Sequence, residues 1–87
     1  LGDTHSMNNL ARIYEEGREG IEKNLEKSIQ IYERAVELGD TNAMNNLAMI
    51  YEEGGEGVEK DIKKAIQLYK RAIEFDDLVS LIRLAMI

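Results

Sequence analysis

The sequence predicts an all-α protein built from antiparallel pairs of helices, and three observations carry that prediction. A pattern occurs twice at an offset of 37 residues, apolar residues recur within it at helical spacing, and proline is absent from all 87 residues. Internal repetition with a period of about 20 to 50 residues is typical of repeat architectures such as helical arrays. A chain of this length forms at most one domain and buries only about 60% of its unfolded surface, so we expect no deep catalytic cleft.

The repeat is clearest at the start of each copy. Gly2-Asp3-Thr4 superimposes on Gly39-Asp40-Thr41, and roughly two-thirds of all positions in the two copies are identical. A third copy starts at Asp77 and stops after Leu84-Ala85-Met86-Ile87, which matches positions 47–50. We therefore expect one helical-repeat domain over residues 1–87, divided into units 2–38 and 39–75 and a partial third unit 76–87.

Each unit contains the pattern of two helices. Met7, Leu10, Ala11 and Tyr14 follow the i, i+3, i+4, i+7 spacing that gathers side chains on one helix face, and segments 25–36 and 62–73 show the same spacing. Helix boundaries are also marked in the sequence. Residues suited to capping the N-terminal amides of helices, and a glycine suited to ending a helix in the left-handed conformation, stand at Asp40, Asp61 and Gly39.

A glycine-rich stretch, YEEGGEGVEKD at 51–61, could be either a phosphate-binding loop or a turn between helices. Phosphate loops of nucleotide-binding motifs follow a strand and provide amides at a helix N-terminus. No strand precedes this stretch, carboxylates surround its glycines, and Arg18 replaces Gly55 in the first copy. The carboxylates also lack the alternating Asp/Asn pattern of an EF-hand calcium loop. We therefore interpret Gly17, Gly20, Gly54 and Gly57 as turn residues with positive φ angles.

The order of these motifs resembles the Sel-one-like repeat (SLR) family, a relative of the tetratricopeptide repeat. The resemblance covers essentially the whole chain, although Ala11 and Ala48 stand where the family usually has glycine, and Asp76 replaces a terminal glycine, which predicts an irregular joint. It implies a right-handed α/α superhelix, or solenoid, of about two and a half repeats. The matching motif is Ala43-x-x-x-Leu47-Ala48-x-x-Tyr51, then Gly55-x-Gly57-Val58-x-x-Asp61-x-x-Lys64-Ala65, then Tyr69-x-x-Ala72.

The resemblance also implies a binding surface, because the first helix of each SLR unit lines the concave side of the superhelix. Asparagine is a mediocre helix former, yet Asn8-Asn9 and Asn45-Asn46 occur in both first helices. Their amides either bond to the neighbouring repeat or face a partner. Carried over to this chain, the groove residues are His5, Asn8, Arg12, Glu15, Asn42, Asn45, Met49, Glu52, Val79, Ile82 and Met86.

The sequence contains no recognisable catalytic or cofactor-binding residues. His5 is the single histidine and is not repeated, since Asn42 takes its place in the second unit. No serine is followed by lysine three residues later, and no second histidine is present to build a nucleophile and base. The tyrosines lie on apolar helix faces and are expected to pack there. We expect no enzyme activity, no metal and no cofactor.

Charge and composition narrow the classes of partner. A net charge of -6 repels phosphate backbones and anionic lipid headgroups, so neither nucleic acid nor a membrane is expected as a partner. No run of about 18 apolar residues is present. The absence of cysteine is compatible with a reducing compartment such as the cytoplasm without proving that localisation.

Both ends of the chain interrupt the repeat. Residues 78–87 are apolar on almost every side, and a helix of that kind must be covered by protein, while Leu1 in place of methionine suggests a truncated start. We expect an internal piece of a longer array. The predicted function is a non-catalytic scaffold that binds a protein or peptide in its concave groove. The alternative is a structural module that self-associates through its ends and its apolar third-unit helix.

Overall fold

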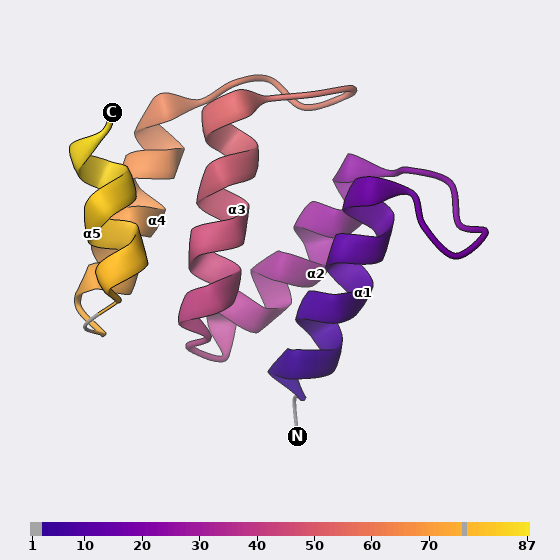
Figure 1. Ribbon diagram of the computed structural model, residues 1–87, viewed down its shortest axis with the longest axis horizontal. Helices are drawn as coiled ribbons and strands as arrows, with labels where there is room; N and C mark the ends of the chain where they lie inside the picture. Colours follow the sequence, from indigo (N-terminus) through magenta and orange to yellow (C-terminus); the bar gives the residue numbers. More distant parts are fainter. Residues whose placement is uncertain (1–2, 76) are drawn as a thin grey trace.

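The computed structural model describes residues 3–75 and 77–87 as helices joined by loops (Figure 1). Its first two helix pairs are antiparallel, and a fifth helix packs on the second pair, which confirms the predicted all-α fold. Leu1, Gly2 and the predicted irregular joint at Asp76 lie outside the described residues. The helices of the described residues are α1 (Thr4–Glu16), α2 (Leu25–Glu37), α3 (Thr41–Glu53), α4 (Ile62–Ile73) and α5 (Leu78–Ala85).

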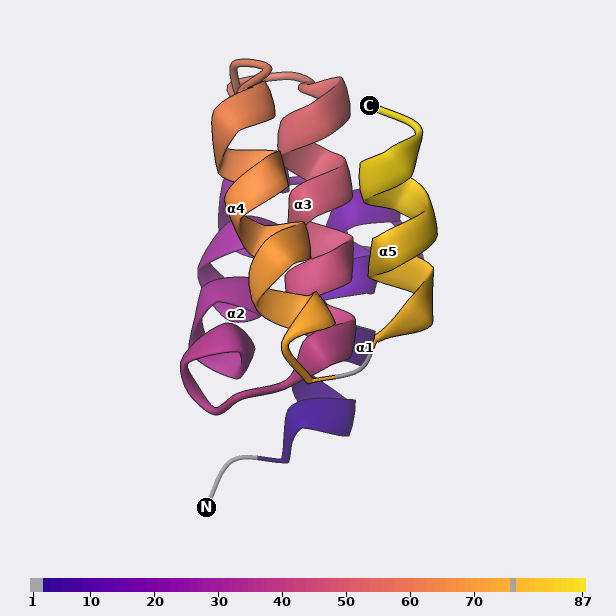
Figure 2. The same ribbon diagram turned by 90° about the vertical axis from the view of Figure 1, so that its left-hand side faces the viewer.

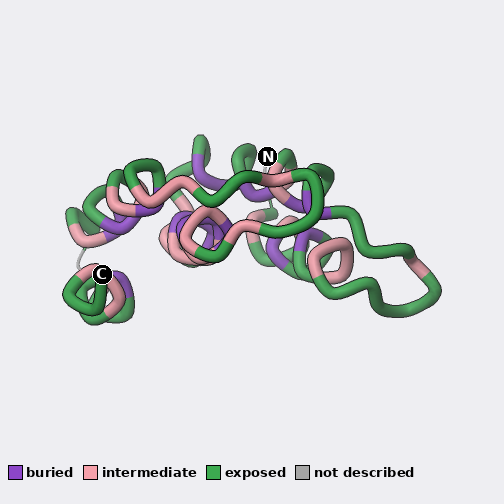
Figure 3. Tube along the Cα trace, turned by 90° about the horizontal axis from the view of Figure 1, so that it is seen from above, coloured by how far each residue is buried: buried purple, intermediate pink, exposed green. Residues whose placement is uncertain are grey.

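The helices form two layers. Figure 2 shows α1, α3 and α5 in one layer and α2 and α4 in the other, so each unit contributes its first helix to one side and its second helix to the opposite side. Seen from above in Figure 3, the buried positions lie between the layers and the outer turns are exposed. Helix α3 packs against α1, α2 and α4, and therefore joins the two units.

The predicted helix boundaries are confirmed by the caps. The Asp40 carboxylate accepts a hydrogen bond from the Ala43 amide at 2.8 Å, and the Asp61 carboxylate accepts one from the Lys64 amide at 3.1 Å. Gly39 adopts the left-handed φ of +86° after α2. Each cap satisfies an amide that would otherwise lack a partner in the first helical turn. Helix α5 ends at Ala85, two residues before the end of the apolar stretch at 78–87.

The glycine-rich loops close back on the helices that precede them. The amide of Asp61 donates to the carbonyl of Tyr51 at 2.7 Å, and Asn24 makes the same bond to Tyr14 at 2.8 Å. Gly54 has a φ of +69°, and a β-carbon there would lie 3.0 Å from the backbone nitrogen of Lys60. The turn interpretation is thus confirmed for the conformation of these glycines, since Gly17, Gly20 and Gly57 also have positive φ, and a side chain at Gly54 would be both strained and crowded.

Contact between neighbouring units explains a difference between the two loops. A β-carbon at Gly55 would collide with the side chain of Leu25, which begins α2 in the first unit. Arg18 occupies the equivalent position in the first unit and is exposed. Gly55 therefore allows close approach of the loop of the second unit to the first unit.

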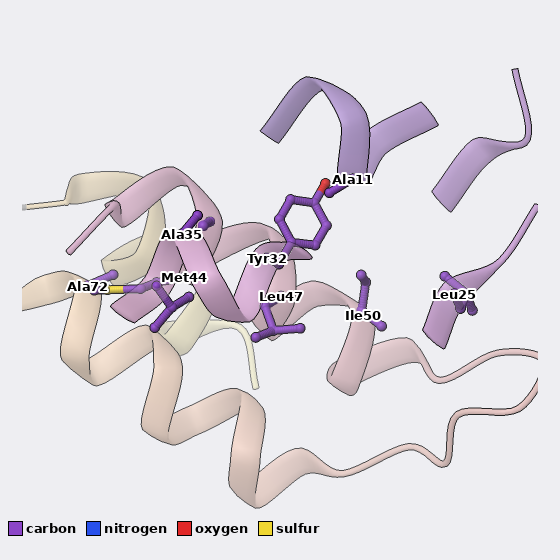
Figure 4. Close-up of a cluster of buried hydrophobic side chains, with 10 residues drawn as sticks. Ala11, Leu25, Tyr32, Ala35, Met44, Leu47, Ile50 and Ala72 are labelled. Carbon is purple, nitrogen blue, oxygen red and sulfur yellow. The ribbon is translucent and has the colours of Figure 1, made fainter. Parts of the chain in front are cut away.

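The core consists of small residues around a few large ones (Figure 4). The larger cluster joins α1, α2 and α3, and it extends to Ala72 of α4. Tyr32 and Met44 are fully buried there, and a smaller cluster surrounds Tyr69 between α3 and α4. The alanines permit close helix packing, and they are fully buried at Ala11, Ala35, Ala43, Ala48, Ala65 and Ala72.

Candidate protein-binding surfaces

The predicted groove residues lie on α1, α3 and α5, except Met86, which directly follows α5, and we call this surface the first-helix face. They differ in exposure. Asn8 is buried, with 8% of its surface exposed. The half-buried residues are Glu15, Asn45, Met49 and Glu52, and the exposed residues are His5, Arg12, Asn42, Val79, Ile82 and Met86.

Two glutamates of the first-helix face bond to buried tyrosines. The Tyr32 hydroxyl donates to Glu15 Oε1 at 3.0 Å, and the Tyr69 hydroxyl donates to Glu52 Oε1 at 2.9 Å. Both tyrosine side chains are fully buried. Sequence reasoning placed these glutamates on the groove but missed their partners. The available signal was the same Glu-to-Tyr separation of 17 residues in both units.

Burial raises the pKa of Glu15, and the hydrogen bond from Tyr32 opposes that shift. Burial and the nearby Glu15 carboxylate raise the pKa of Tyr32, while burial and the Glu52 hydrogen bond raise that of Tyr69. Both hydroxyls therefore remain protonated donors at neutral pH and link the first helix of each unit to the second.

The repeated asparagines have different environments. Asn8 Nδ2 donates to Asp40 Oδ2 at 2.7 Å, which joins α1 to the N-cap of α3 and supports the interpretation of Asn8 as an inter-repeat link. Asn45 is half-buried, and its Oδ1 atom is buried without a hydrogen-bond partner in the described structure. The Oδ1 atom of Asn8 is likewise buried without a partner among the described residues, so each asparagine carries a costly unsatisfied acceptor that is shielded from donors outside the chain.

A second surface lies in the opposite layer, where α2 and α4 separate above α3. The hollow there measures about 830 Å³, and an adjoining hollow of about 550 Å³ shares Gln30, Tyr51 and Lys64 with it. Sequence reasoning did not identify this surface, because its depth depends on how far α2 and α4 diverge. We call it the α2–α4 groove, and its main lining residues are Gln30, Glu33, Arg34, Val36, Glu37, Leu47, Tyr51, Lys64, Gln67, Leu68 and Arg71.

Neither surface gathers the groups needed for metal chemistry. Among residues 3–75 and 77–87, no group of three or more His, Asp or Glu side chains could hold a metal ion. The single histidine, His5, is exposed near the start of α1. Within these described ranges, no helix is both long and apolar enough to cross a membrane. The arrangement offers helix faces, hydrogen-bonding groups and apolar contacts.

Repeated antiparallel helix pairs, held together by matching caps, loops and tyrosine bonds, define a helical-repeat protein. In this class the exposed helix faces are the surfaces available for binding. The model of the Sel1 repeat matches residues 4–40 and 41–74, and the chain belongs to the Sel1 repeat family. This confirms the resemblance identified from the motifs.

Solved structures support the same relationship. The chain is 30% identical to a Sel1 repeat protein from Oxalobacter formigenes, with a TM-score of 0.86 over 94% of this chain and 33% of that one. It is 28% identical to c5321, a protective antigen present in uropathogenic Escherichia coli strains that displays an SLR fold, with a TM-score of 0.86 over 95% of this chain and 18% of that one. No curated protein matched. The chain thus spans a third or less of these two structures.

Proposed function

We propose that the chain is a non-catalytic protein-binding module, and that a peptide or extended segment of a partner protein binds along the first-helix face. Membership of the Sel1 repeat family supports the general class, because helical-repeat domains of this kind commonly mediate protein interactions. The proposal assigns no reaction to the chain. Turnover that is abolished by changing one side chain would contradict it.

The observation that carries the proposal is the accessible part of the first-helix face, where exposed Asn42 and half-buried Met49 lie on α3 and exposed Arg12 lies on α1. An extended peptide has free backbone N–H and C=O groups, with which the Asn42 amide and the Arg12 guanidinium can form hydrogen bonds. Met49 provides an adaptable apolar contact. The surface therefore offers both hydrogen-bonding groups and a flexible apolar side chain to a peptide.

The proposal is tested by measuring the affinity of a partner obtained by capture from the native cells and then purified. We expect the combined change Arg12→Ala, Asn42→Ala and Met49→Ala to weaken binding at least about tenfold, since hot-spot side chains each contribute 1 kcal/mol or more. Circular dichroism would establish that the helices remain folded. Calorimetric titration would supply the dissociation constants.

A matched control changes exposed residues on the opposite layer. Lys63 and Lys70 are exposed on α4, and neither lines the hollows between α2 and α4. We expect Lys63→Ala with Lys70→Ala to leave affinity for the captured partner within about twofold. Equal loss in both variants, or no loss in the first, would contradict the placement of the site on the first-helix face.

A second candidate function, self-association, is favoured by the exposed apolar residues of α5 and by Met86 directly after it. Leu78 is 69% exposed, Ile82 is 62% exposed and Met86 is 76% exposed. Apolar patches of this kind commonly mark association surfaces. We expect the weight-average mass in sedimentation to rise with concentration and Ile82→Lys to abolish that rise. A monomer at every concentration tested would exclude this candidate.

A further inference from the structure

The α2–α4 groove has an apolar floor that is assembled from three helices. Val36 of α2 is 6% exposed and Leu47 of α3 is 3% exposed, while Tyr51 of α3 and Leu68 of α4 are half-buried. The core therefore covers most of Val36 and Leu47, whereas part of the surface of Tyr51 and Leu68 remains accessible from the groove. A partner that enters the groove finds apolar side chains to contact and removes them further from water.

The two walls of the groove are single helix faces. Lys64, Gln67 and Arg71 form one stripe of α4 at i, i+3 and i+7, and all three are exposed. On the α2 side, Glu33 and Glu37 form a stripe of opposite charge. Ridges with this spacing interlock with the side chains of another helix.

Charge in the main hollow of the groove differs in sign from that of the whole chain, whereas the adjoining hollow is lined by more carboxylates than cations. The main hollow is lined by three cations, Arg34, Lys64 and Arg71, and by two carboxylates, whereas the chain carries a net charge of -6. Within the described structure, the one ion pair joins Arg18 to Glu16, at 2.7 Å, so neither cation of the α4 wall is in a salt bridge. The wall formed by α4 therefore attracts carboxylates.

Lys64 connects the charged wall to the apolar floor. Its Nζ atom lies 5.0 Å from the centroid of the Tyr51 ring, and both residues line the main hollow and the adjoining one. This position brings an ammonium group above an apolar surface. A carboxylate bound there would be close to apolar contacts made by the same partner.

We propose that the α2–α4 groove binds an amphipathic helix of a partner protein, with an apolar stripe bordered by carboxylates. The apolar stripe contacts Tyr51 and Leu68, and the carboxylates face Lys64 and Arg71. Helix-in-groove recognition fits because both walls are helix stripes. Two other modes of peptide recognition fit less well. Addition of a strand requires an exposed sheet edge, whereas this groove is lined by helices. Proline-rich segments require grooves lined with aromatic residues, whereas the main hollow contains one aromatic residue, Tyr51.

The length of the walls sets the length of this partner helix. Helix α2 contains 13 residues and α4 contains 12. At a rise of 1.5 Å per residue each wall is roughly 18 to 20 Å long, which corresponds to about three turns of a bound helix. The adjoining hollow, which reaches Gly57 and Lys60, extends the groove towards the loop between α3 and α4.

A synthetic 14-residue peptide serves as the probe, with leucines at i, i+3, i+4, i+7 and i+11, glutamates on the border that faces α4 and a fluorophore at one end. Fluorescence anisotropy measures its affinity for the chain. We expect saturable binding that weakens at least about tenfold when all border glutamates are replaced by lysine. Absence of saturable binding, or equal affinity for the acidic and basic peptides, would overturn the proposal.

The repeat provides a matched control for the contribution of Lys64. Lys27 is its equivalent in the first unit, where its Nζ atom lies 5.4 Å from the Tyr14 ring centroid, but Lys27 does not line the groove. Both lysines are exposed, and reversal changes the net charge equally. We expect Lys64→Glu to weaken binding of the acidic peptide about tenfold and Lys27→Glu to weaken it less than twofold. Equal effects of the two substitutions would refute the placement in the groove.

Two further measurements separate the proposal from its alternatives. A version of the peptide with proline at its centre cannot form a continuous helix, and we expect it to bind at least about tenfold more weakly. Undiminished binding would overturn the helical mode. We expect the triple variant at Arg12, Asn42 and Met49 to bind the acidic probe with unchanged affinity, because those residues lie outside the groove. Loss of probe binding in that variant would place the probe on the first-helix face and contradict the proposal.

Discussion

Replacing Ser28 by alanine should stabilise the protein, because it removes a buried hydroxyl that has no hydrogen-bond partner in the described structure. Ser28 is fully buried in α2, and its Oγ atom has no hydrogen-bond partner in the described structure. The equivalent residue in the second unit is Ala65, which is also fully buried in α4. The chain therefore carries a built-in comparison between serine and alanine at one packing position.

The size of the effect follows from the environment of the hydroxyl. A buried polar group without a partner costs about 1 to 3 kcal/mol, and alanine is a better helix former than serine by a few tenths of a kcal/mol. The β-carbon is retained, so the loss of packing is limited to one oxygen atom. We expect Ser28→Ala to raise the free energy of unfolding by about 1 to 3 kcal/mol, and the reciprocal Ala65→Ser to lower it by a similar amount.

Urea denaturation followed by far-ultraviolet circular dichroism measures both changes. The expected result is a higher midpoint for Ser28→Ala and a lower midpoint for Ala65→Ser, with unchanged slopes of unfolding free energy against urea. For a chain of this size, each 1 kcal/mol corresponds to about 4 to 8 °C in melting temperature. A destabilised or unchanged Ser28→Ala variant would refute the reasoning, because it would mean that the hydroxyl is satisfied in the folded protein.

Three other substitutions test the loops, the link between repeats and the buried carboxylate. Gly54→Ala should lower the free energy of unfolding by about 1 to 2 kcal/mol or more. The loss should exceed that of Gly39→Ala, because both glycines have positive φ but only Gly54 has neighbouring atoms close to an added β-carbon. Equal losses of the two variants in urea denaturation would contradict this. Asn8→Ala removes the 2.7 Å hydrogen bond to Asp40 and should lower the free energy of unfolding by about 1 to 2 kcal/mol. An unchanged free energy of unfolding in urea denaturation would contradict a stabilising role for this bond. The folded pKa of Glu15 is raised above 4.5, so the folded state binds more protons and stability falls as pH rises through 4.5 and the raised value. Glu15→Gln should flatten that fall in melts recorded between pH 4 and 7, and an unaltered slope would contradict the assignment.

The helices and their boundaries could be predicted because their determinants are local. Asp40 and Asp61 cap the helices that follow them, and Gly39 ends the helix before it, in the conformations that their side chains favour. The turn glycines also follow from local geometry. The exchange of Gly55 for Arg18 has a cause that the sequence does not display, since it depends on Leu25 in the adjacent unit.

The surfaces were predicted less completely, because they depend on how units pack. Helical spacing placed Glu15 and Glu52 on the first helices, but the buried tyrosine that each one meets comes from the second helix. Asn8 and Asn45 are equivalent in sequence and each has a buried Oδ1 atom without a partner in the described structure, yet the Nδ2 atom of Asn8 bonds to the cap of the next unit. The α2–α4 groove arises from the separation of two helices over a third, which no residue pattern specifies.

The most direct test of the proposed protein-binding function is a nuclear magnetic resonance titration of the isotopically labelled chain with its purified, captured partner. The account predicts that the largest shifts of backbone amides fall on the first-helix face, at Arg12, Asn42, Asn45 and Met49. Shifts confined to the α2–α4 groove or to the loops, with these four amides unchanged, would contradict the proposed binding site.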